Sequence, residues 1–265
     1  MKPRASIWIV TYKNQEDLNA NLDSLFQYWQ PDLMDIEVNI INNHTQFSLH
    51  NTQWDKVRVW HNRLRSDNSL GHLSRNWNQA LIHGFGSLDS PRVDYVINSQ
   101  DDVLWQPGWC EQMLEATRTY SLVTQGVGDA LVVYKIDAVR AIGLWDERFC
   151  PSFYHDGDYF LRALIYNREF SSINDPAHGR MLNPIPYTFA AVPAANAPRV
   201  DAKNLSYGKA SIPFAVWRSK WPCAPIRWSQ ELIDNPPTNT QCFNYVQYPH
   251  FETNLADLAA RNYLV

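Results

Sequence analysis

The sequence lacks the charge and cysteine patterns of two common classes of protein. Its 265 residues contain 23 Lys and Arg against 27 Asp and Glu, which gives a formal net charge of −4. A protein that binds nucleic acid usually carries a basic surface, so we expect no nucleic-acid partner. The four cysteines show neither CxxC nor CxH spacing, which argues against a zinc site.

Long apolar segments are also missing. No stretch approaches the roughly 20 consecutive apolar residues that a membrane-spanning helix needs. The short apolar run at residues 7–10 indicates a strand and not a signal peptide. We therefore expect a soluble, cytoplasmic protein with reduced thiols and no membrane segment. The sequence gives no indication of the oligomeric state.

Several well-known catalytic motifs are absent. The dinucleotide fingerprint GxGxxG does not occur, because Gly84-Phe85-Gly86 is predicted to close a helix and does not follow a strand. Gly208-Lys209 lacks the rest of a Walker A loop, and neither GxSxG nor HExxH is found. These absences disfavour dehydrogenases, P-loop proteins and hydrolases.

What the sequence does contain, up to about residue 175, is an alternation of strand and helix patterns. Apolar, β-branched runs predict strands at residues 5–11, 36–42 and 57–60, and a fourth that begins at Tyr95. Apolar residues at helical spacing predict three helices, which contain Leu18, Leu22 and Leu25; Leu73, Trp77, Ala80 and Leu81; and Trp109, Met113, Leu114 and Ala116. The alternation predicts an α/β fold with a Rossmann-like, mostly parallel sheet flanked by helices.

The composition changes after Asp175. Eleven of the sixteen prolines follow it, and Trp217, Trp221 and Trp228 lie close together. Such a segment is too irregular for repeated strand–helix units. We expect a core at residues 1–180 and an irregular Pro- and Trp-rich extension at residues 181–265 that packs on the core.

Two adjacent carboxylates, Asp101 and Asp102, follow the fourth strand. Like charges at the end of a buried strand require a compensating cation, and oxygen ligands suit Mg²⁺ or Mn²⁺, which commonly hold nucleotide phosphates. Thr11-Tyr12 and Asn42-Asn43 end two other strands, and right-handed crossovers bring all three ends to one sheet edge. This convergence predicts a nucleotide site. The alternative is a solvated turn, in which Asp is common.

A second pair of carboxylates, Asp156 and Asp158, begins a helix predicted from Tyr159, Phe160, Ala163 and Leu164. Free N–H groups and the helix dipole favour a carboxylate in a first turn, so we expect one of the two to have a capping role. The other remains available to take a proton from a hydroxyl group.

In order and spacing, these features resemble the inverting family-two glycosyltransferases with the glycosyltransferase-A fold. The matching segments are residues 7–12, 42–43, 68–71, 74–76, 100–103, 107–109, 143–149 and 156–158, with Asn62 and Arg162. The resemblance covers about residues 5–180, and residues 217–221 resemble a Lys-Trp segment of some members. It implies transfer of a sugar, with inversion, from a nucleotide-sugar donor to an acceptor hydroxyl, for instance on a glycan.

The resemblance also implies roles for individual residues. The donor would be bound by Thr11, Tyr12, Asn43, Gly71, Arg75, Asn76, Gln100, Asp101 and Asp102. Asp102 would hold Mn²⁺ or Mg²⁺, with His178 as a downstream metal ligand, and Asp156 would be the catalytic base. A surface or core position is the alternative for His178.

The acceptor is expected near Trp145, Tyr154 and Asp158, and the extension is expected either to shape the acceptor site or to cover the donor. Core packing is the alternative for the two aromatic side chains. Two positions depart from the family pattern: Gln100 stands where an acidic residue is usual, and His155 stands where the acidic partner of Asp156 is usual. The first change weakens the metal site, and a charged His155 would lower the pKa of Asp156.

Two other functions stay open. A carbohydrate-binding or structural protein with the same fold would retain the strands and lack turnover. A sugar-nucleotide nucleotidyltransferase would need a glycine-rich basic loop after the first strand, and Lys13-Asn14-Gln15 contains no glycine. The donor sugar, its nucleotide and the acceptor cannot be identified from spacing, because a few pocket contacts decide them.

Overall fold

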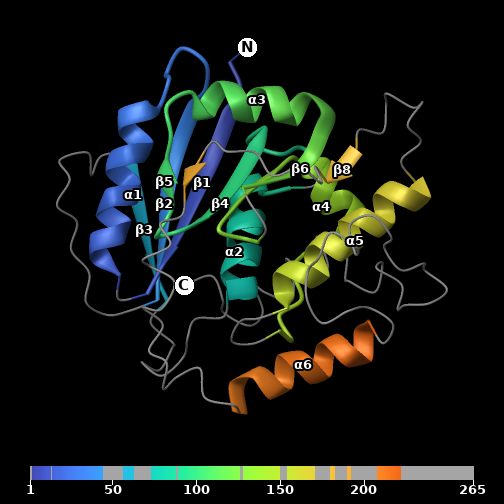
Figure 1. Cartoon of the computed structure of the whole chain (residues 1–265). Coiled ribbons are helices and arrows are strands. Elements are labelled where there is room, and N and C mark those ends of the chain that lie inside the picture. Colours follow the sequence, from blue (N-terminus) through green and yellow to red (C-terminus); the bar gives the residue numbers. More distant parts are fainter. Residues whose placement is uncertain are drawn as a thin grey trace.

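The computed structural model describes residues 2–12, 14–43, 56–62, 73–87, 89–125, 128–149, 154–170, 180–182, 190–191 and 208–221. A seven-stranded sheet lies at the centre of this part of the chain (Figure 1). Its spatial order is β3 (Val57–His61), β2 (Asp35–Asn42), β1 (Arg4–Thr11), β4 (Tyr95–Gln100), β7 (Leu131–Tyr134), β6 (Tyr120–Thr124) and β8 (Arg180–Leu182).

The sheet is mostly parallel, as predicted. Strands β3, β2, β1 and β4 pair in parallel, and β8 pairs in parallel with β6. Only β7 breaks the pattern within the described sheet, since it runs antiparallel to both β4 and β6. The segment between β6 and β7 is too short for the crossover that parallel neighbours require, so the chain reverses there.

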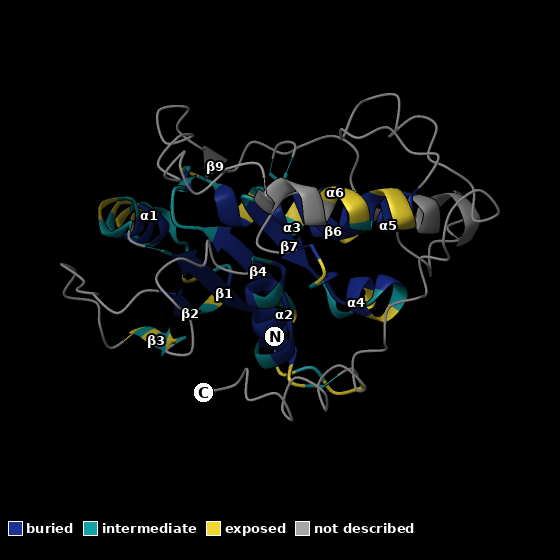
Figure 2. Ribbon diagram, turned by 90° about the horizontal axis from the view of Figure 1, so that it is seen from below, coloured by how far each residue is buried: buried dark blue, intermediate teal, exposed yellow. Residues whose placement is uncertain are grey.

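Helices cover both faces of the sheet. They are α1 (Gln15–Tyr28), α2 (Leu73–Phe85), α3 (Trp109–Thr119), α4 (Ile136–Ile142) and α5 (His155–Phe170). In β1, Ile7 and Ile9 belong to the core under α1 and α3, whereas Trp8 and Val10 belong to the core under α2, α4 and α5. Figure 2 shows the strands as a largely buried layer, with exposed residues on the outer sides of the helices. Both faces of β1 are therefore buried, which explains why this strand is apolar along its length.

The predicted helix end near Gly84 is confirmed to within a residue. Helix α2 ends at Phe85, and Gly86 follows with a φ of +75°, its N–H donating to the Ile82 carbonyl at 2.8 Å. Gly84 itself lies inside the helix, where an added Cβ would stand 2.5 Å from Cγ2 of Val96 in β4. Glycine at position 84 therefore permits close packing of α2 on the sheet.

The described parts of the extension contact the core at several points. Strand β8 adds to the sheet beside β6, and β9 (Ala190–Ala191) pairs with β5 (Leu104–Trp105) in a separate two-stranded sheet. Helix α6 (Gly208–Lys220) lies beside the first turn of α5 (Figure 1). Trp217 and Trp221 are buried there. Within the described ranges, no helix has the length and apolar character needed to cross a bilayer.

Candidate functional site

Three parallel strands end together at the carboxyl edge of the sheet. Thr11 of β1 is paired with Asn42 of β2, and Val10 is paired with Gln100 of β4. The backbone N–H of Asn43 donates to the Thr11 carbonyl at 3.1 Å. The predicted convergence of Thr11, Asn43 and the Gln100-Asp101-Asp102 segment is therefore present in the structure, and Tyr12 follows β1 at this edge.

The carboxylate of Asp101 lies in a confined, negatively charged environment. Burial is the largest influence, and the charges of Asp102 and Asp17 act in the same direction. The Thr11 hydroxyl and the Asn14 amide, the latter at 3.2 Å, donate hydrogen bonds that partly offset them. The balance raises the pKa of Asp101 to about 7. A cation placed here would relieve the repulsion between the carboxylates.

The carboxylate pair fits a divalent cation in chemistry, since it offers hard oxygen donors in a site that favours positive charge. Among the described residues, no group of three or more His, Cys, Asp or Glu side chains is arranged to hold a metal ion. Mg²⁺-type sites commonly use one or two carboxylates and take their other ligands from substrate phosphates and water. The predicted ligand His178 lies outside the described residues, as does Gly71.

Arg75 and Asn76 occupy the first turn of α2 near the same edge. The Asn62 amide donates to Asn43 Oδ1 at 2.9 Å and to Asn76 Oδ1 at 3.3 Å, so Asn76 is linked to the predicted donor site. Arg75 Nε lies 3.5 Å from a carboxylate oxygen of Glu147. Asn76 is therefore brought together with the strand ends, while Arg75 is held beside Glu147.

A buried carboxylate that the sequence patterns do not reveal, Asp129, lies behind this edge. Its Oδ2 accepts a hydrogen bond from Trp77 Nε1 at 2.7 Å and lies 2.8 Å from His155 Nε2. Its Oδ1 accepts a hydrogen bond from Gln100 Nε2 at 3.1 Å. Burial opposes ionisation of Asp129, but the charge of His155 and the hydrogen bonds from His155 and Trp77 outweigh it and lower the pKa of the carboxyl.

Asp129 could not be identified from sequence because a Gly-Asp pair before a strand is typical of an ordinary turn. Its partners lie 52, 29 and 26 residues away along the chain. In the structure, the neighbouring Gly128 has a positive φ.

Asp156 lies in the first turn of α5, directly after His155. Burial and the charge of Asp129 raise the pKa of Asp156, whereas the charge of His155 and the backbone N–H of Gly157 act to lower it. A Cβ added to Gly128 would stand 4.0 Å from Asp156 Oδ2, so the loop before β7 approaches this carboxylate. A carboxylate with a raised pKa is better suited to accept a proton than an ordinary Asp.

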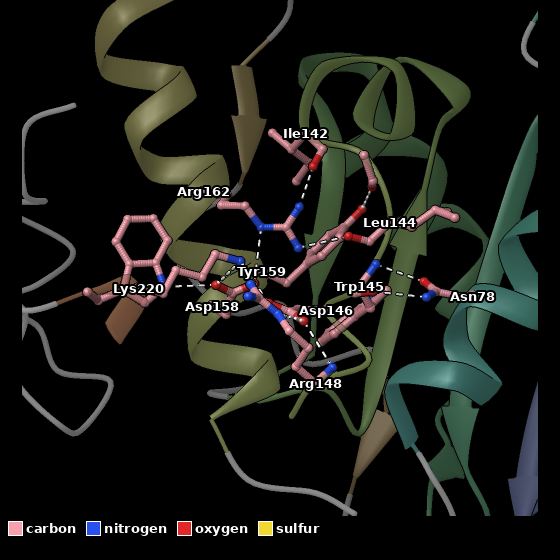
Figure 3. A network of polar contacts seen from close by, with 12 residues as sticks. Asn78, Ile142, Leu144, Trp145, Asp146, Arg148, Asp158, Tyr159, Arg162 and Lys220 are labelled. Atoms are coloured by element: carbon pink, nitrogen blue, oxygen red, sulfur yellow. Dashed lines mark hydrogen bonds and ion pairs between the residues drawn. The ribbon is translucent and has the colours of Figure 1, made fainter. Parts of the chain in front are cut away.

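Asp158 belongs to a buried network of charges between α5, α6 and the loop after α4 (Figure 3). Its carboxylate lies 2.6 Å from Lys220 Nζ and 3.2 Å from Arg162 Nε, and it accepts a hydrogen bond from Trp221 Nε1 at 2.8 Å. Lys220 Nζ also lies 3.2 Å from Asp146 Oδ2. Asp158 is 0% exposed, so its side chain lies wholly inside this network.

The two predicted acceptor aromatics are placed differently. Trp145 is buried and stacks on Tyr159, with ring centroids 4.3 Å apart, so it follows the core-packing alternative. Tyr154 is half-buried, has a φ of +60°, and its ring lies 6.4 Å from Phe214, which is 39% exposed. Of the three predicted acceptor residues, Tyr154 is the one with surface left for an acceptor.

No protein-family model and no curated protein matches the sequence. Among solved structures, the mannosyltransferase PcManGT from Pyrobaculum calidifontis, in complex with GDP-Man and Mn²⁺, is similar with a TM-score of 0.54 and 15% identity over 100% of this chain and 77% of that one. At this identity the likeness shows the fold alone, which is of the glycosyltransferase-A type, as predicted.

Two weaker likenesses carry no argument, because their TM-scores lie below 0.5. Drosophila β1,4-galactosyltransferase 7, in complex with xylobiose, has a TM-score of 0.42 at 10% identity, over 71% of this chain and 67% of that one. TarS from S. aureus has a TM-score of 0.41 at 12% identity, over 61% of this chain and 55% of that one.

Proposed function

We propose that this chain is a nucleotide-sugar-dependent glycosyltransferase that inverts the configuration of the anomeric carbon. One observation carries the proposal: Gln100 and His155 bind the same carboxylate, that of Asp129. Gln100 directly precedes the carboxylate pair at the sheet edge, and His155 directly precedes Asp156. The two acidic segments that the transfer reaction requires are thus connected through one side chain.

The donor would lie along the carboxyl edge of the sheet, where open α/β sheets bind nucleotides. Thr11 ends β1, Tyr12 follows it and Asn43 follows β2, and these residues would contact the base and ribose. Asn76 is linked to Asn43 through Asn62, and together with Arg75 and Gly71 it would lie near the diphosphate. Asp101 would bind the ribose or the donor sugar.

A divalent cation, Mn²⁺ or Mg²⁺, would be held by Asp102, with His178 as a further ligand, and would neutralise the charge that develops on the leaving diphosphate. The raised pKa of neighbouring Asp101 supports this assignment, since the two carboxylates are crowded and partly buried and a cation would stabilise their ionised forms. PcManGT was solved with Mn²⁺ and a nucleotide sugar on the same fold.

Asp156 would take the proton from the acceptor hydroxyl as its oxygen attacks the anomeric carbon from the face opposite the diphosphate. The new carbon–oxygen bond forms while the bond to the diphosphate oxygen breaks, and the bonding electrons leave with the diphosphate. The transition state has oxocarbenium character, as in glycoside hydrolysis. Tyr154 would contact the acceptor sugar, and the extension, through α6, would complete this side of the site.

The donor site is tested by thermal unfolding with UDP-, GDP-, dTDP- and CDP-sugars, each with Mn²⁺ and with EDTA. A ligand at about 100 times its dissociation constant stabilises the folded state by roughly 2.7 kcal/mol. We expect a metal-dependent rise in Tm with one nucleotide class. If the folded protein shows no rise with any donor, the donor site is refuted and a carbohydrate-binding or structural role becomes the better account.

Turnover is tested by measuring release of the nucleoside diphosphate by wild type, D156N and D137N. Asp137 forms an exposed ion pair with Arg140 on α4 and serves as the matched control. We expect D156N to lose turnover while its donor affinity is kept, and D137N to behave as wild type. A nucleotidyltransferase would instead release pyrophosphate from a nucleoside triphosphate and a sugar phosphate.

A further inference from the structure

Asp129 is a buried carboxylate with three side-chain partners beside the candidate site. It stands between Gly128 and β7, and it is 7% exposed. Its two oxygens contact three side chains from different elements: Trp77 on α2, Gln100 at the end of β4 and His155 at the start of α5. A short, buried carboxylate with three partners holds each of them in a fixed direction.

The backbone around Asp129 is itself anchored to the sheet. The N–H of Gln100 donates to the Ala130 carbonyl at 2.8 Å, and the N–H of Gln125 donates to the Leu131 carbonyl at 2.9 Å. β7 then pairs with β4 and β6. The carboxylate is therefore presented from a rigid strand end, which is what a side chain needs in order to orient others.

The two departures from the family pattern meet at this carboxylate. Gln100 replaces an acidic residue and donates its amide to Asp129 Oδ1, and His155 replaces an acidic residue and lies at hydrogen-bond distance from Oδ2. A carboxylate at either position would face Asp129 with like charge at about the same distance, which is unfavourable. The amide and the imidazole are thus matched to the acid at position 129.

We propose that Asp129 is a positioning residue: through Gln100 it fixes the segment that carries Asp101 and Asp102, and through His155 it fixes the turn that carries Asp156. It acts on both sides of the site without contacting donor or acceptor. The inference rests on the proposed function for its catalytic consequence, and its structural part is testable without any substrate.

The first test compares wild type, D129N and D146N. Asn has nearly the shape of Asp but no charge. Its NH₂ group would face at least one of the three donors and could not accept that hydrogen bond. Asp146 is also buried and ion-paired, but with Arg148 and Lys220, so D146N controls for the loss of a buried carboxylate. We expect kcat of D129N to fall about 100-fold, since small misplacements of reacting groups have effects of this size, with a smaller change in donor KM.

The second test reverses the Gln100–Asp129 hydrogen bond. Q100E alone places two carboxylates opposite each other and should impair turnover, although it restores the acid that is usual in the family. Adding D129N to Q100E lets the new amide donate to the new carboxylate. We expect the double variant to be at least tenfold more active than the product of the two single effects predicts.

Three results would overturn the proposal: a folded D129N with kcat within threefold of wild type, a D146N that loses as much kcat for the same fall in Tm, or additive effects of Q100E and D129N. NMR of the ligand-free protein separates this inference from the proposed function. If no donor binds or turns over, the proposed function fails. The structural part of the inference is then judged only by the NMR signals of the His155 ring nitrogens and the Gln100 side-chain amide. Shifts of both signals in D129N uphold the shared carboxylate, and unchanged signals refute it.

Discussion

Replacing Lys220 by Met should strongly destabilise the protein, because this lysine joins α6 to α5, the helix that carries the proposed base Asp156. Its side chain is 3% exposed, and its Nζ lies 2.6 Å from Asp158 and 3.2 Å from Asp146. The buried members of the network are two carboxylates, Lys220 and Arg162, so their formal charges balance. Met is similar in length to Lys, so the substitution removes mainly the charge.

The loss of stability in K220M depends on the partners that Asp158 and Asp146 retain. Removing one partner of a buried ion pair typically costs about 3–5 kcal/mol, because the other charge stays buried and unpaired. Here Asp158 keeps Arg162 and Trp221, and Asp146 keeps Arg148, whose side chain is 64% exposed. We therefore expect a loss near the lower limit, about 3 kcal/mol. That is a large share of the roughly 5–15 kcal/mol that stabilises a typical domain.

The assay is urea unfolding of K220M, wild type and R218A. Arg218 is exposed on the same helix, so R218A should change stability by less than about 0.5 kcal/mol.

Burial works against ionisation of Asp146, but Arg148 and Lys220 hold its pKa at about 2, below its ordinary 3.8. Stability from this ionised group is present above pH 3.8 and is lost as the pH falls toward 2.

The difference in free energy of unfolding between K220M and wild type should accordingly shrink as the pH falls from 3.8 toward 2, since protonation of Asp146 removes part of the unbalanced charge. A loss below about 1 kcal/mol at pH 7, with an unchanged m-value, would refute the reasoning, because it would mean that the pair behaves as a solvated surface contact.

Three further predictions concern the base and two glycines. Burial raises the pKa of Asp156, and if Asp156 is the base, as proposed, it must be ionised to act. The kcat should then fall with decreasing pH at values above 3.8, and an acid limb below 3.8 would contradict this. A Cβ on Gly157 would lie 3.2 Å from the Trp217 ring, so G157A should destabilise the wild-type protein. In W217F the smaller ring leaves room, and G157A should stabilise that variant by up to about 1 kcal/mol in urea unfolding. Equal effects in both backgrounds would exclude the contact. G84A should cost about 1–3 kcal/mol because its Cβ would collide with Val96, and a stabilising G84A would show that α2 can shift outward.

The secondary structure was predictable because its signals are local. β1 is apolar along its length since both of its faces are covered, and the spacing of Leu18, Leu22 and Leu25 predicts the buried side of α1. The meeting of Thr11, Asn42 and Gln100 at one edge was also predictable, because crossover handedness leaves parallel strands little choice. The antiparallel β7 was not predicted, since it follows from a short connection and not from the strand itself.

The roles of the second acidic pair could not be separated by sequence. Asp156 and Asp158 share one helix turn and the same capping signal. Their difference comes from Lys220 and Trp221, which lie more than sixty residues further along the chain and enclose Asp158. Asp158 is thus enclosed in the charge network, whereas the carboxylate of Asp156 lies beside Gly128 in the loop before β7.

By itself, the sequence determined the first four strands and the helices α1, α2, α3 and α5, which strand ends carry polar side chains and where two acidic segments begin. Those properties depend on neighbours a few residues apart. Only the tertiary structure decided that Gln100 and His155 share Asp129, and that Trp145 packs in the core. The physical reason is that the energy of a buried charge or ring depends on the groups that surround it, and folding brings those groups from distant parts of the chain.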